Sequence, residues 1–474
     1  MDSPTSSPLP HLSRRQALQQ TTTGFAWLAF SALAHQEALA SRSLAPKAPH
    51  FPARAKRVIM LTMPGAPSHV DTFDYKPQLT KDHGKPGKYG NLRGATLLGS
   101  PWEFKQHGQG GIWISELFPH VASMADDICL LRGMHTDIPN HNQAQLQMHT
   151  GSFQFARPSI GVWTLYGLGS VSGNLPGFIW MNAGKGANHI TDSSFLPAQY
   201  QGTSINMPRG GGDNRKGGRK SGRTQEGGVR NIKNPAMSPG QQRKQLDFIQ
   251  ALNQDKLQRE THHTGIDGVI ESYELAFRMQ AHLPEVMDFS NEPQPVQELY
   301  GIGASQTDEF GRKCLLARRM AEAGVRFIEL GHSPGWDTHG NLKVQLAESC
   351  QATDRPIAGL LKDLKQRDML KDTLVIWSGE FGRTPHGQNG NGRDHNAKGY
   401  TSWMAGAGVK GGFSYGNTDE HGYEAVEGKM HIRDWHATIL HLLGLDHERL
   451  TYRYAGRDFR LTDVGGRVAK DILA

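Results

Sequence analysis

Acidic and histidine side chains that could hold a metal ion recur along this 474-residue chain. The candidates are Asp71, His141, Asp337, His339, Glu380, Asp394 and His395. Carboxylates mixed with imidazoles, without cysteine, are typical ligands of Zn, Ca, Mn or Mg and not of a thiolate site. A divalent ion held by such groups can stabilise an oxyanion and activate water. The residues therefore predict a metal centre with the chemistry needed to hydrolyse an ester.

Several of these residues also have a purely structural interpretation. Asp71 could cap a helix or a turn, and His141 could cap the helix that it begins. Arg383 and Arg393 are suited to binding the anionic oxygens of an ester, but either could instead pair with a nearby carboxylate. The sequence leaves these alternatives open.

The candidates follow apolar segments that are typical of buried parallel strands, at residues 57–63, 127–134, 325–330 and 373–377. Segments with helical periodicity alternate with these runs. In open parallel α/β sheets, ligands bind beyond the carboxyl ends of the strands. We therefore expect an α/β domain over residues 51–474, a three-layer α/β/α sandwich with a mostly parallel central sheet, and a site at one edge of that sheet.

The N-terminal segment reads as an export signal. Arg14 and Arg15 precede an interrupted apolar run at residues 24–33, and a small-residue pattern follows at residues 38–40. This order predicts a twin-arginine signal peptide over residues 1–40 and a periplasmic or secreted protein. The run is shorter than the ~20 apolar residues of a spanning helix, so we expect no transmembrane helix in the mature chain.

A basic, glycine-rich segment interrupts the domain. Residues 209–230 contain seven Lys or Arg against two acidic residues, which accounts for +5 of the formal net charge of +7. Such a segment has little to bury, so we expect a disordered insertion over residues 203–243. Because the rest of the chain is nearly neutral, we expect no nucleic-acid partner. The three cysteines lie in apolar segments and are assigned no chemistry.

Long motifs also resemble a known family. GAPSHVDTFDYKP, NHNQAQLQMHTG, GWDTH, TLVIWSGEFGRTP and GRDHN are similar to those of the exported bacterial family called domain of unknown function 1501. That family resembles the alkaline phosphatase and sulfatase superfamily, whose members hydrolyse or transfer phosphate and sulfate esters with one or two metal ions. The resemblance implies an alkaline phosphatase-like fold, with Asp71 and Glu380 among the metal ligands.

The resemblance is imperfect at the site. His141 stands where those enzymes carry formylglycine, Ser or Thr, and there is no CxPSR motif. His141 could therefore be a phosphoryl acceptor, a metal ligand or part of a site without covalent chemistry. Phe381 stands where an imidazole is usual, Asp337 and His339 are more closely spaced than in phosphatases, and Asp394-His395 resembles the last histidine ligand.

Two functions are compatible with these observations. One is a metal-dependent hydrolase of phosphate or sulfate esters in the cell envelope, in which His141 or water attacks and Arg383 holds an anionic ester, such as a polysaccharide or envelope component. The alternative is a non-catalytic envelope- or carbohydrate-binding protein on the same scaffold.

Overall fold

The computed structural model describes residues 44–87, 95–181, 188–205, 236–259, 264–332 and 335–474. The expected signal peptide, residues 1–40, lies outside the described residues. Most of the expected insertion, residues 206–235, also lies outside them. Residues Ala45–Ala474 form one compact unit.

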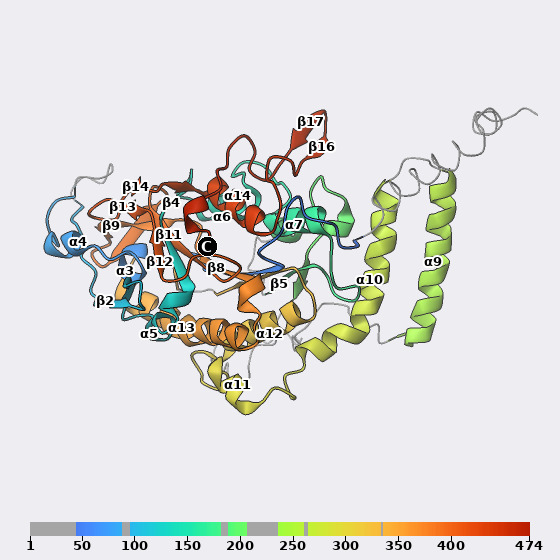
Figure 1. Cartoon of the computed structure of the whole chain (residues 1–474), viewed down its shortest axis with the longest axis horizontal. Coiled ribbons are helices and arrows are strands. Elements are labelled where there is room, and N and C mark those ends of the chain that lie inside the picture. Colours follow the sequence, from blue (N-terminus) through green and yellow to red (C-terminus); the bar gives the residue numbers. More distant parts are fainter. Residues whose placement is uncertain (1–43, 88–94, 182–187, 206–235, 260–263, 333–334) are drawn as a thin grey trace, which may run out of the picture. The chain divides into compact units, whose positions relative to one another are not determined.

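A nine-stranded sheet runs through this unit (Figure 1). Its strands are, in sheet order, β12 (Phe413–Tyr415), β4 (Ile128–His135), β11 (Tyr400–Ala405), β8 (Thr373–Ser378), β1 (Arg57–Thr62), β7 (Phe327–Gly331), β5 (Phe178–Met181) and β6 (Thr203–Ile205), while β15 (Met430–His431) also pairs with β4. All pairings are parallel except those of β11 with β4 and β8. The expected α/β fold with a mostly parallel central sheet is confirmed.

The four strands expected from apolar runs are present as β1, β4, β7 and β8, but a further strand lies between two of them. Strand β11 lies between β4 and β8 and runs antiparallel to both. Its residues include Trp403 and Met404, which are fully buried. No apolar run predicted this strand, since polar residues such as Thr401 and Ser402 interrupt its sequence.

The expected boundaries of the insertion were too wide. Thr203–Ile205 form β6, which pairs in parallel with β5, and helix α9 begins at Pro239. Backbone pairing to β5 gives this short segment a place in the sheet even though its side chains offer little apolar surface.

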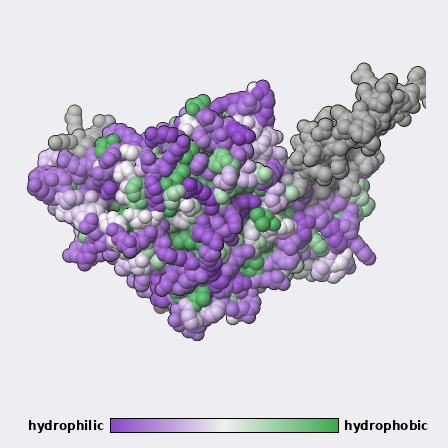
Figure 2. Space-filling view, in the orientation of Figure 1, coloured by the Kyte–Doolittle hydropathy of each residue, from purple (hydrophilic) through white to green (hydrophobic). Residues whose placement is uncertain are grey.

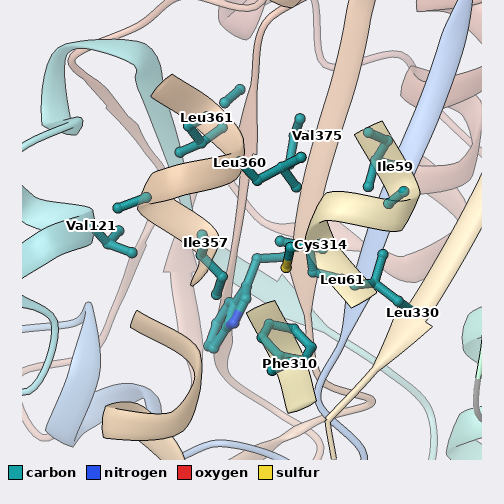
Figure 3. Close-up of a cluster of buried hydrophobic side chains, with 14 of the residues drawn as sticks. Ile59, Leu61, Val121, Phe310, Cys314, Leu330, Ile357, Leu360, Leu361 and Val375 are labelled. Atoms are coloured by element: carbon teal, nitrogen blue, oxygen red, sulfur yellow. The ribbon is translucent and has the colours of Figure 1, made fainter. Parts of the chain in front are cut away.

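Helices cover both faces of the sheet (Figure 1). On one face lie α5 (Pro119–Ala122), α12 (Asp308–Glu322) and α13 (Leu342–Gln366), and on the other lie α6 (His141–Thr150), α7 (Ile160–Leu168) and α14 (Ile432–Leu442). Successive strand residues alternate between these faces. Figure 3 shows Ile59, Leu61 and Val375 beside the side chains of α12 and α13. Burial of each such side chain contributes about 1.5–3 kcal/mol.

The remaining elements surround this core. The helices are α3 (His69–Thr72), α4 (Pro77–Lys81), α8 (Asn188–Thr191), α9 (Pro239–Arg259), α10 (Thr264–Met287) and α11 (Gln294–Leu299), with 3-10 turns η1 (Ala125–Asp127), η2 (Ala198–Tyr200), η3 (Leu370–Asp372) and η4 (Lys470–Ile472). The two-stranded pairs are β2 (Phe104–His107) with β3 (Ile112–Ser115), β9 (Gly382–Gln388) with β10 (Gly392–Asn396), β13 (Asn417–Thr418) with β14 (Ala425–Glu427), and β16 (Tyr452–Tyr454) with β17 (Arg457–Phe459).

The face seen in Figure 2 is mostly hydrophilic, with small, scattered hydrophobic areas. Within the described residues, no helix has both the length and the apolar character that crossing a membrane requires.

Candidate metal centre

Four candidate ligands meet at the carboxyl edge of the sheet. His141 is the first residue of α6, Asp337 and His339 lie in the loop between β7 and α13, and His395 lies in β10. One ligand atom from each of the four residues lies within 4.8 Å of the others. Of the seven residues expected to bind metal, the structure therefore brings these four together.

The spacing of these atoms suits a tetrahedral ion. Asp337 Oδ1 is 3.2 Å from the Nε2 atom of His141, 3.1 Å from that of His339 and 3.4 Å from that of His395. Ligand bonds of about 2.0–2.1 Å to Zn²⁺ correspond to tetrahedral edges of about 3.3–3.4 Å. The protein atoms thus already approximate three edges of such a shell.

Hydrogen bonds on the outer side of each ring turn the Nε2 atoms inward. His395 Nδ1 donates to the Pro139 carbonyl at 2.8 Å, His141 Nδ1 donates to Glu380 Oε1 at 2.6 Å, and His339 Nδ1 donates to the side-chain oxygen of Gln388. Each acceptor places the proton on Nδ1, so each Nε2 presents a lone pair. The Nε2 atoms of His339 and His395 are only 2.8 Å apart, and two lone pairs at that separation require a proton or a cation between them.

Glu380 orients His141 and is not itself part of the cluster. Its carboxylate is buried and accepts the backbone N–H of Gly65, at 3.0 Å to Oε1 and 3.3 Å to Oε2. Burial alone would lower the pKa of His141, but the hydrogen bond and charge of Glu380, with the charge of Asp337, raise it above its usual value. Glu380, expected as a ligand, is thus placed beside the cluster and not in it, with its oxygens facing Gly65 and the Nδ1 side of the ring.

His141 does not cap its own helix. The N-cap is Asn140, whose side chain accepts the backbone N–H of Gln143. The ring of His141 is therefore free to use one nitrogen toward Glu380 and the other toward the cluster.

Arg383 binds Asp337 and several backbone carbonyls. The side chain is fully buried, and its Nε and Nη1 groups donate to the carbonyls of Ala66 (3.0 Å) and Arg393 (3.3 Å). Its Nη2 donates to the Gly65 carbonyl and to Asp337 Oδ1 at 2.6 Å. Burial opposes ionisation of Asp337, but the hydrogen bond and charge of Arg383 lower the pKa of this carboxyl to about 2. The structure thus places Arg383, expected to hold an ester, in contact with Asp337 and backbone carbonyls.

Asp71 lies outside the cluster. Arg393 donates to both of its oxygens, Nε to Oδ2 at 2.6 Å and Nη2 to Oδ1 at 3.0 Å, and the Ser68 hydroxyl donates to Oδ2 at 2.5 Å. A carboxylate engaged in this way has no oxygen directed at the four clustered residues. The structure therefore does not bring Asp71, expected as a ligand, together with these four residues.

Asp394 is next to the cluster but on its outer side. Its Oδ1 accepts the backbone N–H of His395 at 2.8 Å and lies 3.9 Å from His339 Nδ1, the nitrogen that faces away from the other ligands. It therefore supports the two neighbouring histidines and does not join them as a ligand.

Two polar residues with histidine partners were not anticipated. Gln388 reaches His339 only because the hairpin of β9 and β10 folds over the loop that follows β7, and no sequence signal marks it. Glu329 pairs with the buried His149 at 2.7 Å, and here a signal existed, since it is a charged residue inside an apolar run.

Comparisons with known proteins agree on a family but not on an activity. The family model described as "Protein of unknown function (DUF1501)" matches residues 55–473. No curated protein matches the sequence.

Similar solved structures are distant from this chain. They include the PsFucS1 sulfatase from Pseudoalteromonas sp., with 13% identity and a TM-score of 0.33, covering 90% of this chain and 73% of that one. The phosphonate monoester hydrolase SpPMH from Silicibacter pomeroyi has 11% identity and a TM-score of 0.36, with 88% and 76% covered. A mutant TAB5 alkaline phosphatase with bound Mg has 11% identity and a TM-score of 0.32, with 77% and 94% covered. Likeness at this level carries no argument about activity.

Proposed function

Because the chain belongs to the DUF1501 family of proteins of unknown function, its activity has to follow from its own site, and we propose that it is a metal-dependent hydrolase of phosphate or sulfate esters. The observation that supports this proposal is the compact cluster formed by His141, Asp337, His339 and His395, whose candidate ligand atoms all lie within 4.8 Å of one another. A divalent ion bound there supplies a Lewis acid for the ester oxygen and a means of activating water.

The ligand chemistry favours a transition metal. Three imidazole nitrogens and one carboxylate oxygen suit Zn²⁺, with Mn²⁺ as the nearest competitor, whereas Mg²⁺ and Ca²⁺ prefer shells made of oxygen. We propose Zn²⁺ as the resident ion, held by the three Nε2 atoms and Asp337 Oδ1.

The partners of His141 support a ligand role and not a nucleophilic one. Glu380 occupies Nδ1 at 2.6 Å, and Nε2 points to the other ligands, 3.2 Å from Asp337 Oδ1. No ring nitrogen remains to form a bond to phosphorus or sulfur. We therefore propose water as the nucleophile.

In this proposal the anionic ester finds positive charge elsewhere than at Arg383, which is fully buried and bound to Asp337 and backbone carbonyls. In this proposal the bound cation provides that charge, and the first turn of α6, which starts at His141, adds its backbone dipole. The substrate is proposed to be an anionic ester such as a polysaccharide or envelope component, reached after export of the protein to the periplasm by its twin-arginine leader.

One observation favours a second function. Four protein ligands can complete a tetrahedral shell and leave no open position, as in structural zinc sites. A non-catalytic envelope- or carbohydrate-binding protein that uses the ion to hold its loops would have the same cluster.

Metal analysis and turnover separate these functions. The protein is exported with its own leader, its metal content is measured, and it is assayed on an aryl phosphate, an aryl phosphodiester and an aryl sulfate. The hydrolase proposal expects one equivalent of metal and turnover of at least one ester, both lost in His339→Ala and both kept in His282→Ala, an exposed histidine that pairs with Glu285 at 3.8 Å. Bound metal without turnover would favour the non-catalytic function, and absence of metal uptake would contradict both.

A further inference from the structure

A buried ion pair lies directly behind the candidate metal centre. Asp71 and Arg393 have no exposed surface, and two N–H···O contacts of 2.6 and 3.0 Å join them. Ser68 donates to Asp71 at 2.5 Å, and Arg393 Nη1 donates to the Thr384 carbonyl at 3.2 Å. The pair therefore joins the loop after β1 to β10.

Strand β10 in turn touches the loop that carries two of the ligands. The backbone N–H of Arg393 donates to the Thr338 carbonyl at 2.9 Å, between Asp337 and His339. At Gly392, a Cβ atom would lie 2.1 Å from the His339 carbonyl carbon, so the two backbones pack as closely as a glycine allows. His395 follows two residues after Arg393 on the same strand. Arg393 is thus anchored next to three of the four ligands.

A buried pair of this kind has a geometric role beyond stability. Replacing a buried ion pair with apolar residues of similar volume is often neutral or stabilising, so stability alone does not account for it. The planar guanidinium bound by both oxygens of Asp71 does, however, fix the direction of the arginine side chain and hence of the strand that bears it.

We propose that Asp71 and Arg393 are positioning residues for the metal centre: their pair holds β10 against the loop after β7 so that His339 and His395 face Asp337 before an ion binds. This inference rests on the metal centre of the proposed function, but not on ester hydrolysis. Asp71 contributes to ion binding through Arg393 and not as a ligand.

The experiment compares two buried pairs from the same loop. Asp74 and Lys76 pair at 3.1 Å with side-chain exposures of 0% and 6%. The pair also contacts Asn417, Thr418 and, at 3.9 Å, Arg132, none of which belongs to the four-residue cluster. The double variants Asp71→Leu/Arg393→Met and Asp74→Leu/Lys76→Met are prepared metal-free, and each is titrated with Zn²⁺ by calorimetry. Thermal unfolding of the metal-free proteins is measured in parallel.

The proposal expects the first double variant to bind Zn²⁺ about 10- to 100-fold more weakly than the wild type, the range typical of residues that support metal ligands. This loss of affinity should be larger than any fall in the melting temperature of the metal-free variant can explain. The second double variant should bind Zn²⁺ as tightly as the wild type does. Arg393→Lys, which keeps the charge but loses the two-point contact, should lose about tenfold and is the test if the double variant does not fold.

Wild-type affinity in Asp71→Leu/Arg393→Met, or in Arg393→Lys where that variant is the test, would overturn the positioning role while leaving the metal centre intact. An equal loss in both double variants would also overturn it, because the effect would then be general. A wild-type protein that takes up no Zn²⁺ would instead overturn the metal centre itself.

Discussion

The segments that follow β1 and β7 reach the same edge of the sheet with similar residue types, but of the two only the second contributes side chains to the candidate metal cluster. In the loop after β1, Asp71 and Asp74 have no exposed surface and pair with Arg393 and Lys76. In the loop after β7, the side chains of Asp337 and His339 are 47% and 35% exposed. The difference lies in the partners of the side chains and not in their identity.

The contacts of one oxygen of Asp337 show how the loop after β7 differs from the segment after β1. Arg383 binds Oδ1 by a single donor, and three imidazole nitrogens approach the same oxygen within 3.1–3.4 Å. Asp71 instead has both oxygens engaged by one guanidinium. Arginine thus engages one oxygen of Asp337 but both oxygens of Asp71, which leaves Asp337 more capacity to bind a further cation.

The largest expected effect tests the buried ion pair in the segment that follows β1. Asp74→Ala removes the partner of a buried lysine, and leaving a buried charge unpaired costs about 3–5 kcal/mol, so the free energy of unfolding should fall by that amount. Urea unfolding of the metal-free protein measures it. A change below 1 kcal/mol would show that the two loops differ less than their contacts indicate.

The next effect tests the exposed loop that follows β7. His339→Ala should lower Zn²⁺ affinity by more than about 100-fold, since loss of a direct ligand should exceed the 10- to 100-fold cost of losing a supporting residue. The wild type should gain about 2.7 kcal/mol of stability at a free Zn²⁺ concentration 100 times its Kd, and chelation should remove the gain. Thermal unfolding with and without a chelator measures both, and a gain retained in His339→Ala would remove this residue from the centre.

A supporting contact should matter less than a ligand. Glu380→Gln keeps the shape of the side chain but replaces the charged acceptor of His141 Nδ1 with a neutral one. Zn²⁺ affinity should fall about 10- to 100-fold, as expected for an outer-shell partner. Calorimetric titration measures the change. If Glu380→Gln weakens binding as much as His339→Ala does, Glu380 should be counted as a ligand.

Histidines that face the cluster can also be contrasted with one that the core keeps neutral. His436 of α14 is fully buried, its Nε2 donates to the Met148 carbonyl of α6 at 2.7 Å, and burial lowers its pKa to about 3. Below about pH 6.5 this imidazole is protonated in the unfolded chain but stays neutral in the folded protein. The stability it contributes is therefore fully present above that pH and declines as the pH falls toward 3. Between pH 7 and 5 the loss should be about 2 kcal/mol.

His436→Gln keeps a donor for Met148 and removes the titrating group. The difference in free energy of unfolding between pH 7 and pH 5 should therefore be smaller in this variant, by about 2 kcal/mol. Urea unfolding at the two pH values, with the metal-free wild type as reference, measures it. If the free energy of unfolding changes equally between the two pH values in both proteins, another group causes the acid sensitivity.

Local sequence patterns predicted four of the nine strands and most of the polar residues at the edge of the sheet. Apolar runs predicted β1, β4, β7 and β8, because burial on both faces of a parallel sheet leaves a continuous local pattern. The residues that follow those strands, together with the hairpin after β8, contained all four clustered side chains. These predictions succeeded because strand formation and chain direction are local properties.

Contacts between distant segments separate the four clustered side chains from the candidates that lie around them. Asp71, Glu380 and Asp394 share residue type and sheet edge with the ligands, but each is turned toward a different partner. His141 meets Glu380 across 239 positions of sequence, and Asp71 meets Arg393 across 322. Whether a carboxylate faces an arginine, a histidine or an ion depends on which distant strands the fold brings beside it, and the local sequence does not encode that proximity.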